Sequence, residues 1–185
     1  MIDDVLQETR ERMGKSEQAF EKEMSKVRTG RASQSMLDSV MVDYYGSQTP
    51  LPQMATVSVP ESRLITVKPW DVSVIGEVEK AIMKANLGLT PSNDGKLIRI
   101  AIPPLTEERR KEIVKSVAKT CEDYKVAVRN IRRDSNEMLK ELQKDGDISE
   151  DDCFKGQKLV QDATDESIKK LDQIFAGKEK EILEV

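Results

Sequence analysis

A long apolar stripe between positions 114 and 142 constrains the fold of this 185-residue chain most strongly. Its positions advance by three and four residues without a break, and Ser135 is the one clearly polar member. They are Val114, Val117, Cys121, Tyr124, Val128, Ile131, Ser135, Met138 and Leu142. A mean period of about 3.5 residues is typical of a long helix packed lengthwise against other helices. The stripe therefore predicts a helical bundle.

Four cations lie beside this stripe: Lys125, Arg129, Arg132 and Arg133. Helical residues three and four apart are neighbours, and neither Arg129 nor Arg132 has a carboxylate at those offsets. We therefore expect no acid within reach along their own helix, and three like-charge contacts that destabilise it by roughly 1 kcal/mol. Arginine suits bidentate phosphate contacts, so we interpret the cluster as facing an external anion. A solvated face, or pairing with acids on a neighbouring helix, is the alternative.

Two further helices are expected to share the bundle. Residues 2–28 carry a broad apolar face, and Gly30 follows as a C-cap. The long helix is predicted to run from its N-cap at Thr106 to about Lys144, and Asp145-Gly146-Asp147 ends it. Ser149 then caps the third helix. Each of these three helices has one apolar face, and the three faces must be buried against one another.

The segment between the first two helices changes character. Strands are predicted at 40–44, 57–59, 64–67 and 97–102, and a helix at 74–85 with Ile75, Val78, Ile82 and Met83 inward. Residues 46–52 and 88–95 are expected to be turns. The fold class is therefore α+β: an antiparallel three-helix bundle (1–30 and 104–185) with a small inserted α/β domain (31–103). Two backbone strands, at Gly30-Arg31 and Pro103-Pro104, join the domains and favour hinge motion.

The composition excludes several classes of protein. The chain has no histidine, which removes histidine-based triads and most zinc sites. Asp94-Gly95-Lys96 lacks the spacing of a phosphate-cradling loop, so we expect no enzyme, cofactor or metal. Cys121 and Cys153 show no CxxC spacing, and Cys121, which lies on the apolar stripe, is expected to be a buried, reduced thiol. No membrane span or signal sequence is recognisable, which favours a cytoplasmic protein.

The charge is segregated along the chain. The formal net charge is −4, yet residues 103–135 carry net +3 and residues 136–185 carry net −6. A local basic face can therefore coexist with an acidic whole.

A second basic cluster, Lys26, Arg28 and Arg31, lies where the first helix meets the inserted domain. Cations at a helix C-terminus interact favourably with the helix macrodipole. This stabilisation is the alternative explanation for the positions of Lys26 and Arg28. Tyr44 and Tyr45 are expected to point to opposite faces of a strand, so that one ring faces outward. These rings and Trp70 are predicted to be core or interface residues, without a base-stacking platform.

Four segments together resemble the bacterial ribosome recycling factor family. They are Lys26-Val27-Arg28-Thr29-Gly30-Arg31-Ala32-Ser33, Val42-Asp43-Tyr44-Tyr45-Gly46, Pro103-Pro104-Leu105-Thr106-Glu107-Glu108-Arg109-Arg110-Lys111 and Val126-Ala127-Val128-Arg129-Asn130-Ile131-Arg132-Arg133-Asp134. The resemblance extends from end to end, including the inserted domain.

The resemblance implies a function. Members of this family bind the large ribosomal subunit after termination, and with elongation factor G and GTP they split the ribosome into subunits for reuse. Their ribosomal RNA contacts lie on the bundle, where the family's arginine motifs match Arg129 and Arg132, and a second basic motif matches Arg28 and Arg31. The hinge maps onto Gly30, Arg31, Pro103 and Pro104.

Charge pattern adds Arg133 and Lys26 to the predicted RNA-binding residues. We expect a monomer that partners the large ribosomal subunit, its RNA and elongation factor G, but no membrane. The alternative is a helical scaffold whose basic face binds RNA or a protein partner.

Overall fold

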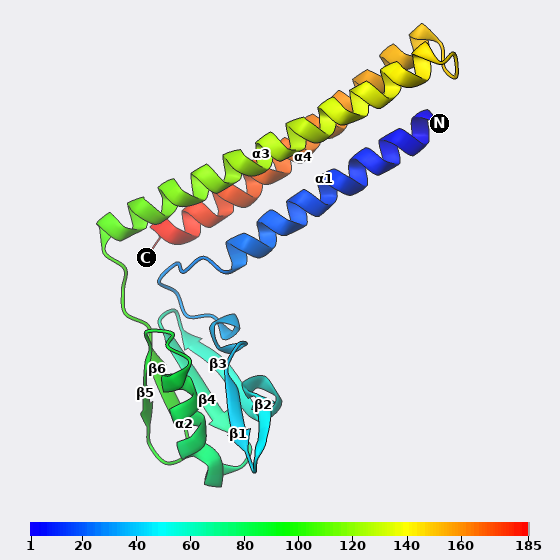
Figure 1. Ribbon diagram of the computed structural model, residues 1–185. Helices are drawn as coiled ribbons and strands as arrows, with labels where there is room; N and C mark the ends of the chain where they lie inside the picture. Colours follow the sequence, from blue (N-terminus) through cyan, green and yellow to red (C-terminus); the bar gives the residue numbers. More distant parts are fainter. Residues whose placement is uncertain (185) are drawn as a thin grey trace. The chain divides into compact units, whose positions relative to one another are not determined.

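The computed structural model describes residues 1–184, which form two units (Figure 1). The first unit contains Met1–Val27 and the chain from Glu107 onward. The second unit is Arg28–Thr106.

The first unit is the predicted antiparallel three-helix bundle. Its helices are α1 (Ile2–Ser25), α3 (Glu107–Lys144) and α4 (Glu150–Leu183). Helix α3 runs opposite to α1 and α4, so the N-terminus lies at the same end of the bundle as the turn between α3 and α4 (Figure 1). This arrangement confirms the predicted fold class for the helical part of the chain.

The core of the bundle consists of two apolar clusters. The larger is built around Phe20, Val128 and Leu171. The smaller lies near the N-terminus of α1 and is built around Leu6, Leu139 and Val160. Four buried hydroxyl residues complete the bundle interior: Thr9, Ser135, Thr164 and Ser167.

The apolar stripe of α3 departs from the prediction near its end. Met138 is 38% exposed, and Leu139, one residue further on, is fully buried instead. The buried positions Ile131, Ser135 and Leu139 step by four, because a straight α-helix has 3.6 residues per turn and drifts away from a 3.5-residue repeat. The predicted seam position at Met138 is therefore wrong.

Helix α1 ends earlier than predicted. Its last helical residue is Ser25, and the amides of Lys26 and Val27 bond to carbonyls only three residues back, at 3.2 and 3.1 Å. The Ser25 hydroxyl also donates a hydrogen bond to the Lys22 carbonyl oxygen at 2.6 Å, which stabilises this tight last turn. Lys26 is the C-cap, so the assignment of Gly30 to that position is wrong.

The turn between α3 and α4 follows the prediction. Gly146 has a positive φ of 83°, and the amide of Asp147 bonds to the Leu142 carbonyl at 2.9 Å, which closes α3. The Ser149 side chain then accepts a hydrogen bond from the amide of Asp152 at 3.1 Å, as expected of an N-cap.

The second unit contains an antiparallel four-stranded sheet, a two-stranded sheet and helix α2 (Ile75–Lys84). The larger sheet has the order β3-β4-β6-β5. Its strands are β3 (Ala55–Glu61), β4 (Leu64–Pro69), β5 (Thr90–Asn93) and β6 (Ile98–Ala101). Strands β1 (Met41–Tyr44) and β2 (Ser47–Pro50) form the smaller sheet. Short 3-10 turns are present at Gln34–Leu37, Leu51–Gln53 and Val72–Val74.

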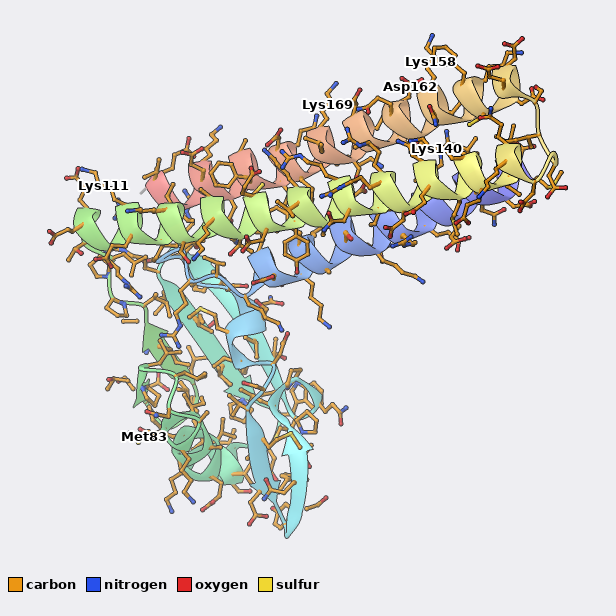
Figure 2. All side chains as sticks on the ribbon, turned by 45° about the horizontal axis from the view of Figure 1, so that its top comes forward. Met83, Lys111, Lys140, Lys158, Asp162 and Lys169 are labelled. Carbon is orange, nitrogen blue, oxygen red and sulfur yellow. The ribbon has the colours of Figure 1, made fainter. Side chains whose placement is uncertain are left out.

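The core of this unit joins the inner face of α2 to the sheets. Val78 and Ile82 of α2 pack with Ile65, Val67 and the other buried aliphatic residues. Met83 was predicted to face inward, but it is 55% exposed and lies on the outer side of α2 (Figure 2). At 100° per residue, position 83 falls beside the buried stripe of Val78 and Ile82 rather than on it.

Strands β2 and β5 were predicted to be turns, and that prediction is wrong. Both are short and polar, and each contains a proline. Strand β5 lies at an edge of its sheet, where a proline is tolerated and few side chains need be apolar. Without apolar alternation, these segments carry no strand signal.

The two segments that connect this unit to the rest of the chain meet within it. Gly30 has a φ of 77°, and a β-carbon there would lie 3.2 Å from the Leu105 side chain. The turn between β3 and β4 accepts both segments: the Ala32 amide donates to Ser62 at 2.7 Å and the Ile102 amide to Arg63 at 2.8 Å. The beginning and the end of the inserted unit are therefore held side by side.

Within residues 1–184, the helices do not combine the length and the apolar character that a bilayer-crossing segment needs.

Candidate nucleic-acid interface

The four cations beside the stripe of α3 have partners on two different helices. Two of them, Lys125 and Arg132, reach side chains of α4 directly. Lys125 pairs with Asp172 at 2.5 Å, and the pKa of its ammonium group is raised, chiefly by that hydrogen bond. The expected alternative, neutralisation by an acid of the neighbouring helix, therefore holds for Lys125.

Arg129 has a carboxylate partner on its own helix, so the prediction that none lies within reach is wrong. Its guanidinium contacts Glu122 at 2.9 Å. Residues seven apart lie two turns away on the same side of a helix, and two long side chains can span that distance. The prediction considered offsets of three and four residues only. Both side chains are exposed (42% and 55%), so the pair is screened by solvent.

Arg132 is held by a neutral partner. Its Nη1 donates to the Gln161 side-chain oxygen of α4 at 3.1 Å, in a partly buried setting. Gln161 in turn donates from Nε2 to Asp165 at 2.9 Å. The charge of Arg132 is therefore not cancelled by its direct partner.

Arg133 also contacts an amide. It donates from Nη2 to the Asn130 side-chain oxygen at 2.9 Å, and it is exposed. Of the four cations beside the stripe, two are paired with carboxylates and two with amides. Among these four cations, Arg132 and Arg133 are the two whose direct partner carries no negative charge.

The second basic cluster is divided between the units. Lys26 is exposed and ends α1, where a cation also favours the helix dipole. Arg28 belongs to the inserted unit, and its Nη2 donates to the Leu87 carbonyl at 2.8 Å. Arg31 is exposed and also has an interaction within the structure. The structure thus brings Arg129, Arg132 and Arg133 together on α3, and places Arg28 and Arg31 in the other unit.

Two aromatic side chains of the inserted unit are exposed. Tyr45 is 75% and Trp70 66% exposed, so the core role is wrong for both, and the prediction that one ring of the tyrosine pair faces outward is confirmed by Tyr45. Strand β1 ends at Tyr44, and Tyr45 has a φ of 50°, so strand alternation does not apply to the pair. Their rings meet edge to face with centroids 4.7 Å apart, and the prediction that they point to opposite faces is wrong.

Both thiols are free and buried, which confirms the prediction for Cys121. Burial raises the pKa of the Cys121 thiol above its ordinary value. Among residues 1–184, no three Cys, Asp or Glu side chains gather in a way that could hold a metal ion.

Three residues that shape the interface escaped the sequence analysis: Glu122, Gln161 and Asp165. The spacing of Gln161 and Asp165, four residues apart in a helix, indicates that they interact. Their link to Arg132 depends on the register between α3 and α4, which the sequence pattern alone does not define.

Comparison with known proteins shows the family. The family model described as ribosome recycling factor matches residues 20–183. Ribosome-recycling factors from Desulforapulum autotrophicum and Bacillus licheniformis are 68% and 55% identical to this chain over 185 residues, covering 100% of each chain.

Solved structures agree with these matches. The solution structure of a ribosome recycling factor superposes with a TM-score of 0.79 at 38% identity, covering 100% of this chain and 98% of the other. A second describes the T. thermophilus ribosome recycling factor, with E. coli elongation factor G, bound to the E. coli post-termination complex. It matches with a TM-score of 0.65 at 44% identity over 99% of both chains.

The three-helix bundle and the inserted unit with its antiparallel sheet define a two-unit α+β protein. The chain belongs to the ribosome recycling factor family. The resemblance found in the sequence is thereby confirmed.

Proposed function

We propose that this chain binds the post-termination ribosome and, with elongation factor G and GTP, splits it into subunits for reuse in the cytoplasm. Family membership along the whole chain supports this function. So does the similar factor whose structure is described together with elongation factor G on the post-termination complex. The proposed partners are the large ribosomal subunit, its RNA and elongation factor G.

The proposed docking surface is the cationic flank of α3, formed by Arg129, Arg132 and Arg133. The observation that carries it is the amide pairing of Arg132 and Arg133, which leaves both guanidinium charges available to phosphate. Arginine forks match phosphate oxygens, and RNA helices are recognised largely through their backbone. Lys26, Arg28 and Arg31 are proposed as further contacts.

The proposed mechanism is mechanical. The chain makes and breaks no covalent bond, acts as a monomer and needs no cofactor of its own. The bundle holds the large subunit while the inserted unit receives force from elongation factor G. Bending at the two boundaries between the units, next to the proposed hinge residues Gly30, Arg31, Pro103 and Pro104, would let the force move one unit against the other.

Light scattering of post-termination ribosomes tests the proposal directly. Mixing them with the protein, elongation factor G and GTP should lower the scattered intensity as subunits separate. Scattering should stay constant without GTP. If the complete mixture leaves the scattering unchanged, the proposed function is wrong.

Two variants test the parts separately. Arg132→Ala should weaken binding to large subunits and reduce the slope of log affinity against log salt by about 1. A cross-link between the two units should abolish splitting and leave docking intact; full activity of the locked protein would exclude the hinge. Saturable one-to-one co-sedimentation with ribosomes distinguishes this function from a general RNA or protein scaffold.

A further inference from the structure

A chain of two hydrogen bonds links Arg132 of α3 to a carboxylate of α4. The guanidinium donates to the Gln161 oxygen at 3.1 Å, and the Gln161 nitrogen donates to Asp165 Oδ1 at 2.9 Å. Arg132 and Gln161 are half-buried, and Asp165 is exposed. The guanidinium is thus fixed between two helices instead of swinging freely from one.

The orientation of the Gln161 amide is determined by its two neighbours. An ionised carboxylate only accepts hydrogen bonds and a guanidinium only donates them. The amide must therefore turn its nitrogen to Asp165 and its oxygen to Arg132. Asp165 lies four residues after Gln161 on the same helix, so it fixes the amide locally.

A neutral tether suits a phosphate-binding arginine better than an acidic one. Gln161 occupies one of the five N–H donors of Arg132 and leaves its net charge in place. Lys125 offers the contrast on the same flank, because its α4 partner Asp172 cancels its charge. A guanidinium that is already ordered loses less conformational freedom when it binds.

We propose that Gln161 is a positioning residue, which holds Arg132 in place for a phosphodiester oxygen of RNA without neutralising it, and that Asp165 sets the orientation of Gln161. The inference rests on the proposed function, because it assumes that Arg132 binds RNA phosphate. A purely structural role, in which Gln161 only ties α3 to α4, makes a different prediction for an acidic replacement.

The decisive variant is Gln161→Glu. It keeps an acceptor for Arg132 and adds charge to that contact, but it exchanges the hydrogen bond to Asp165 for repulsion between two carboxylates. The variant is therefore also made together with Asp165→Asn, which restores a donor. For this pair, a structural role predicts a folded protein with unchanged RNA binding. Positioning by a neutral group predicts that Gln161→Glu behaves like Arg132→Ala. Affinity for large ribosomal subunits should fall about tenfold, and the salt slope should decrease by about 1, because one cation is neutralised.

Matched controls separate this effect from added negative charge. Gln173→Glu places the same charge at an exposed position of the same helix. Asp162→Asn alters a carboxylate that projects from α4 away from the other two helices (Figure 2). Both are expected to change affinity less than twofold and to leave the salt slope unchanged.

Gln161→Ala provides the second test. It removes the tether but keeps the Arg132 charge, so affinity should fall about two- to tenfold with an unchanged salt slope. If this variant fails to fold, Gln161→Glu decides alone.

The outcomes separate the positioning role of Gln161 from the proposed RNA-docking surface on which it depends. If Arg132→Ala loses affinity while Gln161→Glu matches Gln173→Glu, the positioning role is wrong and the docking surface stands. If Arg132→Ala itself binds like the unaltered protein, the proposed docking surface is wrong.

Discussion

Thr9 of α1 and Ser135 of α3 share a buried hydrogen bond, with 2.7 Å between their hydroxyl oxygens. Each hydroxyl also bonds to a carbonyl of its own helix, Thr9 to Val5 at 2.6 Å and Ser135 to Ile131 at 2.9 Å. The two hydroxyl protons are therefore shared among three contacts, two to carbonyls and one between the hydroxyls. Either residue can donate in the contact between the hydroxyls.

Removing both hydroxyls of this pair should destabilise the bundle by less than the sum of the two single removals. We expect Ser135→Ala or Thr9→Val to lower the free energy of unfolding by about 1–2 kcal/mol, because the remaining buried hydroxyl loses a partner. The double variant should lose less than the sum. Urea unfolding of the four proteins measures the coupling, and strictly additive losses would argue against an interaction between the two hydroxyls.

Three helical glycines should respond differently to alanine. A β-carbon at Gly156 would lie 3.1 Å from both terminal methyls of the fully buried Leu139, whereas Gly14 and Gly177 have open space. Gly156→Ala should therefore lower stability by about 1 kcal/mol, because overpacking outweighs the gain in helix propensity. Gly14→Ala and Gly177→Ala should raise it by up to about 1 kcal/mol. Thermal and urea unfolding provide the comparison; equal shifts in α4 for Gly156→Ala and Gly177→Ala would exclude the close contact.

Stability should decline at alkaline pH because of Cys121. Burial raises the pKa of its thiol above the ordinary 9.0, so the folded protein retains the proton longer than the unfolded chain. This contribution is complete below the unfolded pKa and is lost as the pH rises through the folded pKa. Tyr124 acts in the same direction, because donating a hydrogen bond to Glu23 raises its pKa.

Unfolding free energies measured between about pH 8 and pH 11 check this prediction. The decline should be shallower in Cys121→Ala and in Tyr124→Phe, even if either variant is less stable at neutral pH. An identical pH dependence in all three proteins would show that neither group contributes.

The Arg129–Glu122 pair should compete with RNA. Glu122→Gln releases the guanidinium from its carboxylate, so affinity for large ribosomal subunits should rise about two- to fivefold, the range of an exposed ion pair. The gain should shrink at high salt. Arg129→Ala combined with Glu122→Gln is the control, and a gain that persists in it would mean that Glu122 acts independently of Arg129.

The helices were predictable because several local signals agree. Ser149 has the capping side chain, Gly146 has the backbone freedom to end α3, and an apolar stripe lies between the ends of each helix. The exact buried positions of the stripe were less predictable. Met138 and Leu139 are consecutive and both apolar, so the sequence pattern does not show which of them is buried. The packing of α3 against both α1 and α4 selects Leu139.

The candidate site was predictable in part. The sequence indicates the cations of α3, because they are arginines without acids at the nearest helical offsets. It does not indicate their partners. Glu122 lies seven residues from Arg129, and Gln161 approaches Arg132 from another helix, so each contact depends on side-chain reach or helix register.

Gly30 and Leu105 lie close together near the beginning and the end of the inserted unit, and the Ser62–Arg63 turn accepts hydrogen bonds from Ala32 and Ile102. Because the two ends of the inserted unit are held close together, the unit acts as a short connection between the helices that precede and follow it. The entropy cost of closing the connection between α1 and α3 then depends on the few residues that link each helix to the inserted unit, and not on the full length of that unit. Lengthening a loop at the far end of the inserted unit should accordingly leave the folding of the three helices almost untouched.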